Sequence, residues 1–384
     1  MVILEFFGNF VTTILLSYLA FTNTLAEKIE SILPSPSSTE ITEVKTAETI
    51  PQFEEADKNR TGGKSILSKI LLEHAEFQKA ATIASTRDEE VAPLADGVPL
   101  EESVRGALVN IYCQYKTKQY IRTTTGSGFF INQKGVILTN AHIAQFLLLK
   151  GLGSDEHTVD CVIRTGDPAT PKYKAELLYI SPTWIFENAK LITDEMPRGT
   201  GERDYAMLYV SASTEGTPLP TRFPAIPMDV ALLARSVTGS SVVTAGYPAG
   251  ALIRNGANAK LLPVTANTTV GTLYTFGSNY ADIFSVSDSP VGEQGASGGP
   301  IVTTASHQAI GLIVTKGDET IEGAHSLRAL SLSYVNRTII EETGFSLLQN
   351  MQGDVAYRGS IFKKAMVPFL AGILEDELAH EKKP

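Results

Sequence analysis

The sequence is poor in the residues on which metal and redox chemistry depend. Its 384 residues include only two cysteines, Cys113 and Cys161, and one tryptophan. The two cysteines stand too far apart for a C-x-x-C zinc or dithiol motif, and no other metal-ligand spacing occurs in the sequence. The sequence therefore predicts neither a metal site nor a cofactor.

Positive charge is also scarce. There are 32 Lys and Arg residues against 42 Asp and Glu residues, which gives a net charge of −10 at pH 7. A protein that binds nucleic acid needs a basic patch to meet the phosphates. We therefore do not expect nucleic acid among the partners of this protein.

Apolar residues and turn residues are plentiful by contrast. The chain is 43% hydrophobic and contains 31 glycines and 19 prolines. From about Glu101 onward, short runs rich in Val, Ile and Thr alternate with Gly and Pro turns, and about twelve such runs predict an all-β core built as a barrel or a sandwich. The strand candidates are residues 107–116, 126–140 (two strands with a turn at Lys134-Gly135), 158–165, 172–181, 204–210, 240–248, 261–276, 283–287, 300–304, 309–316 and 329–335.

The N-terminal segment, residues 1–26, has the pattern of a membrane helix. No charge occurs from Phe6 to Ala26, a length sufficient to cross a bilayer. A retained transmembrane anchor is one interpretation, and a signal peptide cleaved after Ala26 is the other. We favour the anchor, because the residues before the apolar run contain Glu5 and no Lys or Arg. Both interpretations place the rest of the chain outside the cytoplasm, either anchored to the membrane or secreted.

Three further segments flank the predicted β region. Residues 27–63 are rich in Ser, Thr, Pro and Glu and are predicted to be a flexible linker. Residues 64–100 contain a helix, predicted over 64–85 from its apolar stripe, and a connecting segment. Residues 341–384 form a C-terminal helical extension, in which Pro368 interrupts the helical pattern.

A candidate nucleophile lies in the stretch GEQGASGGPIV, at Ser297. Small residues surround it, and glycines allow backbone conformations that a side chain forbids. A nucleophilic serine needs such a turn, because its hydroxyl must be exposed while nearby N–H groups converge where an oxyanion forms. The backbone amides of Gly295 and Ser297 are the candidate donors of this oxyanion hole.

Two more residues complete a catalytic set. His142 follows a predicted strand in ILTNAHIA, where it can act as a general base. Asp204 begins the strand DYAMLYV, where a buried carboxylate can hold an imidazole in one tautomer. The order His142, Asp204, Ser297 is that of the chymotrypsin-type triad.

Three segments together resemble the trypsin-like serine peptidases of the bacterial HtrA/Deg kind: GSGFFINQKGVILTNAHIA, DYAMLYV and GEQGASGGPIV. The similarity covers about residues 101–340. It implies a chymotrypsin-like fold of two six-stranded antiparallel β-barrels packed at right angles, with the active site in the cleft between them. His142 and Asp204 would belong to the first barrel and Ser297 to the second. The implied activity is that of a serine endopeptidase acting on proteins or peptides through an acyl-enzyme.

The chain departs from relatives of this kind in two respects. Trypsin-like digestive enzymes carry Asp directly before the nucleophile, whereas this chain has Ala296. Activation through a newly freed N-terminus is therefore not expected, and activity should depend on the ordering of loops. Residues 341–384 are too few for the PDZ domain that often follows the peptidase, so none is predicted. Trimers occur in the family, and a homo-oligomer stays an open alternative here.

The resemblance also assigns a substrate pocket. Val291 would lie near its base, with Val314, Thr315 and Lys316 along its wall. None of these is an acid, so the pocket favours small or aliphatic side chains. Asp288 and Glu293 are close in sequence and keep a basic preference open as the alternative.

Cys113 and Cys161 fall in two predicted strands of the first barrel. Such strands could be neighbours, and a location outside the cytoplasm would permit a disulfide. Two separate buried thiols are the alternative.

Two other functions compete with a peptidase. One is a catalytically silent peptide-binding scaffold of the same fold, which the complete set of His142, Asp204 and Ser297 argues against. The other is a membrane-bound adaptor that recruits partners through residues 64–85.

Overall fold

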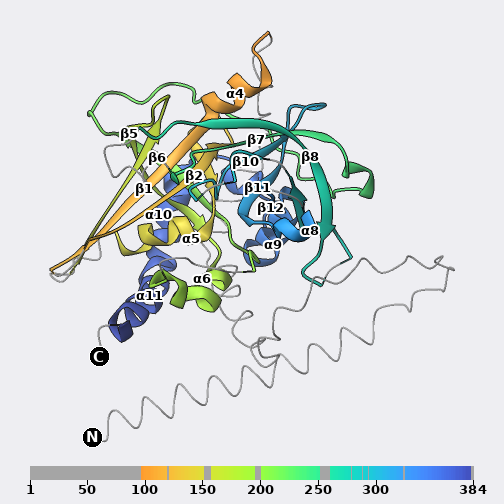
Figure 1. The fold of residues 1–384 in the computed structure, drawn as a ribbon. Helices are drawn as coiled ribbons and strands as arrows, with labels where there is room; N and C mark the ends of the chain where they lie inside the picture. Colours follow the sequence, from red (N-terminus) through yellow and green to blue (C-terminus); the bar gives the residue numbers. More distant parts are fainter. Residues whose placement is uncertain are drawn as a thin grey trace, which may run out of the picture. The chain divides into compact units, whose positions relative to one another are not determined.

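The structure is a computed structural model, shown in Figure 1. It describes residues 97–118, 121–150, 157–194, 200–250, 260–277, 279–287, 289–292, 294–322 and 325–381. The predicted membrane segment, the predicted linker and the predicted helix at 64–85 lie outside these residues. Within them, no helix combines the length and the hydropathy that crossing a membrane requires.

Six antiparallel strands close the first barrel in the order β1-β2-β3-β6-β5-β4. Closure leaves no strand edge unpaired, and the inward-facing residues fill the interior. Burial alternates along the second half of β1, whereas all four residues of β3 and the first five of β6 are buried. The strands are β1 (Leu108–Thr117), β2 (Ile121–Phe130), β3 (Val136–Thr139), β4 (His157–Thr165), β5 (Thr170–Ile180) and β6 (Ala206–Ser213).

The second barrel is also closed and antiparallel, in the order β10-β11-β12-β9-β8-β7. The prediction of two six-stranded antiparallel barrels is therefore confirmed, and the fold is chymotrypsin-like. Val242, Phe284 and Ile301 are fully buried in its core. The strands are β7 (Ser241–Gly246), β8 (Val264–Tyr274), β9 (Ile283–Val286), β10 (Pro300–Thr303), β11 (Ala309–Lys316) and β12 (Leu327–Ser331).

Helices occupy the connections and the C-terminal part of the described chain. The α-helices are α4 (Leu100–Ala107), α5 (Ala141–Ala144), α6 (Pro182–Asn188), α8 (Glu319–Glu322), α9 (Leu332–Thr343), α10 (Val355–Ala365) and α11 (Val367–Glu381). The 3₁₀ turns are η1 (Gln145–Leu149), η2 (Ala189–Ile192), η3 (Arg235–Val237) and η4 (Gln349–Met351).

The last predicted strand, 329–335, is wrong in its second half. The strand β12 ends at Ser331, and helix α9 begins at the next residue. The Ser331 hydroxyl accepts the N–H of Tyr334 at 3.1 Å, which is the hydrogen bond of a helix N-cap. Leu332, Val335 and Ile339 are all buried, so helical spacing continues an apolar pattern that began as strand alternation.

A second difference lies at the start of the β region. The sequence pattern led us to expect strands from about Glu101, but α4 occupies Leu100–Ala107. Pro99 precedes the helix, and Glu101 and Glu102 stand in its first turn, where acidic side chains are favoured by the helix dipole.

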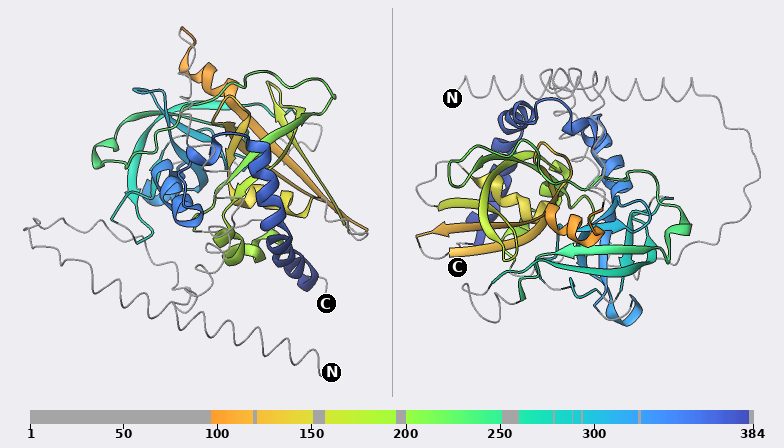
Figure 2. Two further views of the ribbon diagram at one scale, coloured as in Figure 1. Left: turned by 180° about the vertical axis from the view of Figure 1, so that it is seen from behind. Right: turned by 90° about the horizontal axis from the view of Figure 1, so that it is seen from above.

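The C-terminal helices pack on the first barrel (Figure 2). Helix α10 contacts β5 and β6, while α11 contacts α6, η1 and η2. The two helices separate at Met366, beside Pro368, which stands in the first turn of α11 where its missing N–H is tolerated. Leu370, Leu374 and Leu378 are buried on the inner face of α11. The C-terminal extension thus covers β5, the connection between β5 and β6, and the connection between β3 and β4.

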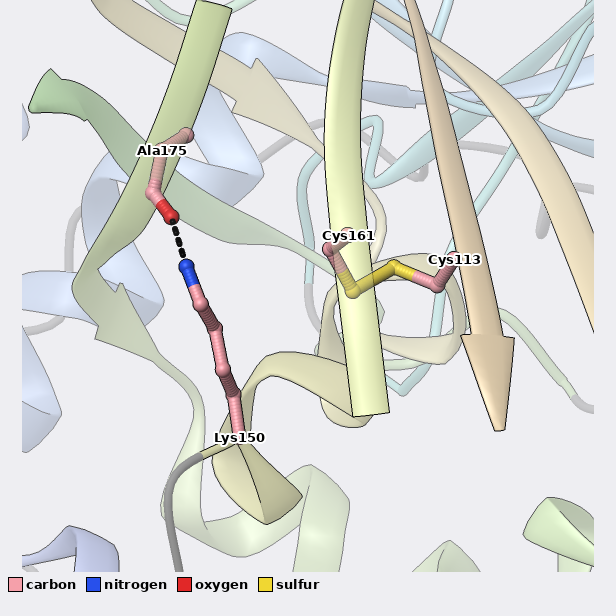
Figure 3. Close-up of a disulfide and its surroundings, with 4 residues drawn as sticks. All are labelled: Cys113, Lys150, Cys161 and Ala175. Carbon is pink, nitrogen blue, oxygen red and sulfur yellow. Dashed lines mark hydrogen bonds between the residues drawn. A yellow bond between two sulfur atoms is a disulfide. The ribbon is translucent and has the colours of Figure 1, made fainter. Parts of the chain in front are cut away.

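The two cysteines form a disulfide between β1 and β4 (Figure 3). Cys113 and Cys161 are directly paired across these neighbouring strands, with a Cα–Cα distance of 4.1 Å. Both are buried. Nearby, the Lys150 ammonium donates to the Ala175 carbonyl and ties the end of η1 to β5.

Candidate active site

His142 and Asp204 are in direct contact. His142 lies in α5, just after β3, and Asp204 lies just before β6, the strand paired with β3. The Nδ1 atom of His142 is 2.6 Å from Asp204 Oδ2, and the backbone N–H of His142 donates to Asp204 Oδ1 at 2.9 Å. Since a carboxylate only accepts, Nδ1 carries the proton and Nε2 is left as the basic atom of the ring.

The carboxylate is shielded while the imidazole keeps access to solvent. The side chain of Asp204 is 7% exposed and that of His142 is 16% exposed. The buried Asn140 side chain donates to the Asp204 carbonyl at 2.8 Å, and Gln145 donates to the His142 carbonyl at 3.0 Å. These bonds fix the backbone on both sides of the contact, so the ring and the carboxylate are oriented before any substrate binds.

Ser297 lies in a turn that is held by backbone hydrogen bonds. Its carbonyl accepts the N–H of Ser127 at 2.7 Å, and the next residue, Gly298, donates to the Ile313 carbonyl at 2.8 Å. Gly298 has a φ of +88°, and a Cβ added there would stand 1.9 Å from the Ser127 carbonyl oxygen. Only glycine fits this position, because it combines a left-handed backbone with close approach to another strand.

Ser127, on β2, is a positioning residue that we did not single out in the sequence. Its hydroxyl donates to the Gly295 carbonyl at 2.6 Å and accepts the N–H of Tyr247 at 2.8 Å. Its carbonyl accepts the Thr139 hydroxyl at 2.7 Å, and the residue is fully buried. A first-barrel side chain thus fixes the second-barrel loop that carries Ser297. Ser127 lies in the stretch GSGFF, where nothing local marks this serine as a bridge between the barrels.

The Ser297 hydroxyl donates to the Val314 carbonyl at 3.2 Å. In this conformation no hydrogen bond joins it to His142, although both residues are described. Ser297 and His142 nevertheless lie beside the same part of β2. The Ser297 carbonyl accepts the N–H of Ser127. A Cβ added at the neighbouring Gly126 would touch Ile143, the residue after His142. The structure therefore brings His142 and Asp204 into contact and places the Ser297 loop beside them.

The backbone N–H groups of Gly295 and Ser297 donate to no described residue. Gly295 has a φ of +96°, and the peptide that follows it is held by the Ser127 hydroxyl. Unpaired N–H groups beside a candidate nucleophile are what an oxyanion hole requires.

The four predicted pocket residues differ in exposure. Val291 is fully buried and packs with the second-barrel core, while Val314 is 7% exposed. Thr315 is half-buried and pairs with Arg328, and Lys316 is exposed at the end of β11. Asp288 and Glu293, the alternative acids, lie outside the described residues.

No group of three or more His, Cys, Asp or Glu side chains in the described part of the chain is arranged to hold a metal ion.

Tyr247, which flanks the Ser297 loop, donates its hydroxyl to the Gly166 carbonyl at 3.0 Å. Burial raises the pKa of this tyrosine to about 12, so it stays neutral in the folded protein.

The comparison with protein families agrees with this architecture. Residues 126–312 match the family model of the trypsin-like peptidase domain. Among solved structures, the crystal structure of the active form of the Rv3671c protease from M. tuberculosis is similar at 18% identity, covering 70% of this chain and 95% of that one, with a TM-score of 0.37. No curated protein gives a significant match.

Proposed function

We propose that the protein with this trypsin-like peptidase domain is a serine endopeptidase, in which Ser297, His142 and Asp204 cleave peptide bonds through an acyl-enzyme. The observation that carries the proposal is the contact between His142 and Asp204, in which both carboxylate oxygens are engaged beside the Ser297 loop. A histidine held in this way has one free basic nitrogen directed by a buried anion, which is the arrangement that a general base needs.

Catalysis would begin when the Ser297 hydroxyl leaves the Val314 carbonyl and turns toward His142 Nε2. The imidazole would take the hydroxyl proton as the oxygen attacks the substrate carbonyl, and Asp204 would stabilise the imidazolium. The proton would then pass to the leaving amine, and water would hydrolyse the acyl-enzyme by the same sequence of steps. The amides of Gly295 and Ser297 would hold the oxyanion, each contributing about 3–4 kcal/mol to the barrier reduction.

Val314, Thr315 and Lys316 would line the substrate side of β11, with Val291 behind them. An extended substrate would pair through main-chain hydrogen bonds with the part of β11 after Leu312, where the pairing with β10 ends. Because these wall residues include no acid, we propose small or aliphatic side chains before the cleaved bond.

We further propose that the peptidase acts outside the cytoplasm as a membrane-anchored enzyme of the HtrA/Deg kind. The disulfide between Cys113 and Cys161 supports this location, since such bonds persist mainly in oxidising compartments.

Labelling with a fluorophosphonate probe tests the activity. The full-length protein in detergent should be labelled at Ser297, and Ser297→Ala should not be labelled. Ser306→Ala, which removes an exposed serine hydroxyl of the same barrel, is the matched control and should be labelled like the wild type. Hydrolysis of an unfolded protein substrate should follow the same order.

A silent peptide-binding scaffold is the second candidate, and the hydrogen bond from Ser297 to the Val314 carbonyl favours it. A hydroxyl held by a carbonyl is not activated. If the folded wild type resists the probe even when an unfolded protein is added, the peptidase proposal fails and the scaffold remains.

A further inference from the structure

The turn that presents Asp204 contains a strained residue. The Asp204 N–H donates to the Gly201 carbonyl at 3.1 Å, which closes a turn of four residues. Its third residue, Arg203, has a φ of +55°. That position in a turn with positive φ normally holds Gly or Asn, because a longer side chain clashes with its own backbone. The arginine must therefore be held in place by contacts elsewhere.

Those contacts come from helix α9. The guanidinium Nη1 of Arg203 donates to Glu342 Oε1 at 3.1 Å and to the Thr338 carbonyl at 3.4 Å. The Arg203 backbone N–H donates to the Tyr334 hydroxyl at 3.2 Å. Nη2 also contacts Glu341 at 2.6 Å, but that side chain is 60% exposed and its share of the stabilisation is small. The contact with Glu342 is the buried one, since that carboxylate is 2% exposed.

The buried carboxylate of Glu342 has a complete set of partners. Oε1 also accepts the Ser181 hydroxyl at 2.9 Å, and Oε2 accepts the Tyr179 hydroxyl. Burial lowers the pKa of Arg203, but the charge of Glu342, together with smaller contributions from Tyr205, Tyr334 and Glu341, outweighs it and leaves that pKa above the ordinary arginine value. Burial and then the same charge raise the pKa of Tyr179, so its hydroxyl stays a donor. The ion pair therefore has hydrogen-bond partners on both carboxylate oxygens, as a buried pair requires.

The residue on the other side of Asp204 is tied to the same helix. The Tyr205 hydroxyl accepts the Thr338 hydroxyl at 2.9 Å, and the Tyr205 ring stacks on Tyr179 with centroids 6.2 Å apart. Asp204 thus lies between two residues that are both anchored to α9. That helix follows β12 directly, so it is continuous with the second barrel, whereas Asp204 leads into β6 of the first.

We propose that Arg203 and Glu342 are positioning residues for catalysis: their buried ion pair holds the strained turn so that Asp204 meets both the ring and the backbone N–H of His142. This inference rests on the proposed peptidase activity. Neither residue touches substrate, so their loss should lower kcat and leave KM unchanged. The ion pair also couples the second barrel to the aspartate of the first.

Arg203→Gly tests the proposal directly. Glycine adopts the same φ without strain, so the variant removes the guanidinium while leaving the turn accessible. Glu342→Gln is the second variant, because it keeps the size of the side chain and removes its charge. Both should lower kcat for peptide hydrolysis by about 10- to 100-fold, with KM within about twofold of wild type, since a small misplacement of a catalytic group has effects of that size.

The matched control is an ion pair that also joins the first barrel to a C-terminal helix. Lys363 on α10 contacts Glu176 on β5 at 3.4 Å, and the Lys363 side chain is exposed while Glu176 is half-buried. Glu176→Gln should leave kcat and KM within about twofold of wild type. A loss of activity in this control equal to that of Arg203→Gly would overturn a specific role for the buried pair.

A readout independent of turnover separates the two proposals. The proton between His142 Nδ1 and Asp204 gives a downfield proton NMR resonance when the contact is ordered, whether or not Ser297 is reactive. We expect this resonance to broaden or disappear in folded Arg203→Gly and Glu342→Gln and to persist in Glu176→Gln. If the resonance and kcat of both folded variants match the wild type, or if only the melting temperature falls, the pair is structural and the inference is overturned. A wild type that shows the resonance but resists the fluorophosphonate probe refutes the peptidase proposal alone.

Discussion

The loop that carries Ser297 and the turn that carries Asp204 are held in different ways. Around Ser297 the support is almost all backbone: Gly298 donates to Ile313, and Ser127 donates to the Ser297 carbonyl. Around Asp204 it is side chains, above all Arg203 and Glu342. A backbone-held loop must be built from glycine, whereas a side-chain-held turn tolerates even an arginine at positive φ.

The largest effect on kcat is expected from removing the negative charge of Asp204. In Asp204→Asn the amide offers Nδ1 a donor as readily as an acceptor, so His142 loses its fixed tautomer. The equivalent change in a chymotrypsin-type triad lowers kcat by about 10⁴-fold, and we expect a similar loss here in peptide hydrolysis. Asp229→Asn is the control, because it removes a carboxylate charge from a turn in which Asp229 Oδ1 accepts the Ala231 N–H, and it should keep wild-type kcat. A kcat for Asp204→Asn within tenfold of wild type would rule out the assigned role of this aspartate.

The next effect comes from breaking the backbone-held loop. In Gly298→Ala the new Cβ would meet the Ser127 carbonyl at 1.9 Å, so the loop must move and the Gly295 and Ser297 amides with it. Loss of oxyanion donors costs about 10²- to 10³-fold in kcat, so we expect a fall of that size in kcat for peptide hydrolysis and slower labelling by the fluorophosphonate probe. Gly106→Ala is the control, because that glycine lies in α4 with nothing near its added Cβ. Equal labelling rates in the two variants would contradict the close approach of β2 to this loop.

A smaller effect is expected from the one side chain on which the loop depends. Ser127→Ala removes the hydroxyl that joins the Gly295 carbonyl to the Tyr247 N–H. Leaving such groups unpaired costs about 1–3 kcal/mol of stability, and we expect kcat to fall by about tenfold. Urea unfolding and steady-state kinetics measure the two effects, with Ser306→Ala as the exposed control. Unchanged kinetics in Ser127→Ala would mean that backbone contacts alone position the loop.

The smallest effect concerns stability and leaves activity near neutral pH unchanged. The pKa of Tyr247 is raised from 10.0 to about 12, so the unfolded chain ionises before the folded protein does. The stabilisation from this residue is complete below pH 10 and is lost as the pH rises from 10 to 12. Urea unfolding at pH 8 to 11 should show that the free energy of unfolding declines less steeply with pH for Tyr247→Phe than for the wild type. Some decline should remain in the variant, because its other buried tyrosines are unchanged. Parallel declines would refute the burial of this hydroxyl.

Much of the fold could be predicted from the sequence. Alternating apolar residues predicted the strands to within a few residues, because the side chains of a barrel strand point alternately inward and outward. The failures occurred where two patterns overlap. LSLSYV alternates like a strand, yet the Ser331 cap turns its second half into α9. Helix α4 was missed because it is only eight residues long, which is shorter than the window of about 11–18 residues over which helical periodicity can be recognised.

The candidate site also combines features that the sequence shows with one that it does not. Ser297, His142 and Asp204 were singled out because a nucleophile, a base and an orienting acid each require a characteristic local sequence, which can be recognised in the chain. The structure places the His142 ring and the Asp204 carboxylate in contact. The Ser297 hydroxyl was expected to serve as a nucleophile, and in this structure it donates to the Val314 carbonyl.

What the sequence determined by itself was therefore local: where strands alternate, where glycine is obligatory, and which three residues carry the candidate chemistry. Only the tertiary structure decided that Ser127 holds the Ser297 loop and that Glu342 pairs with Arg203 beside Asp204. Gly295 is 168 positions from Ser127, and Glu342 is 139 positions from Arg203. A serine or a glutamate has many potential partners at such separations, and only the closure of two barrels against each other and the packing of α9 choose one of them.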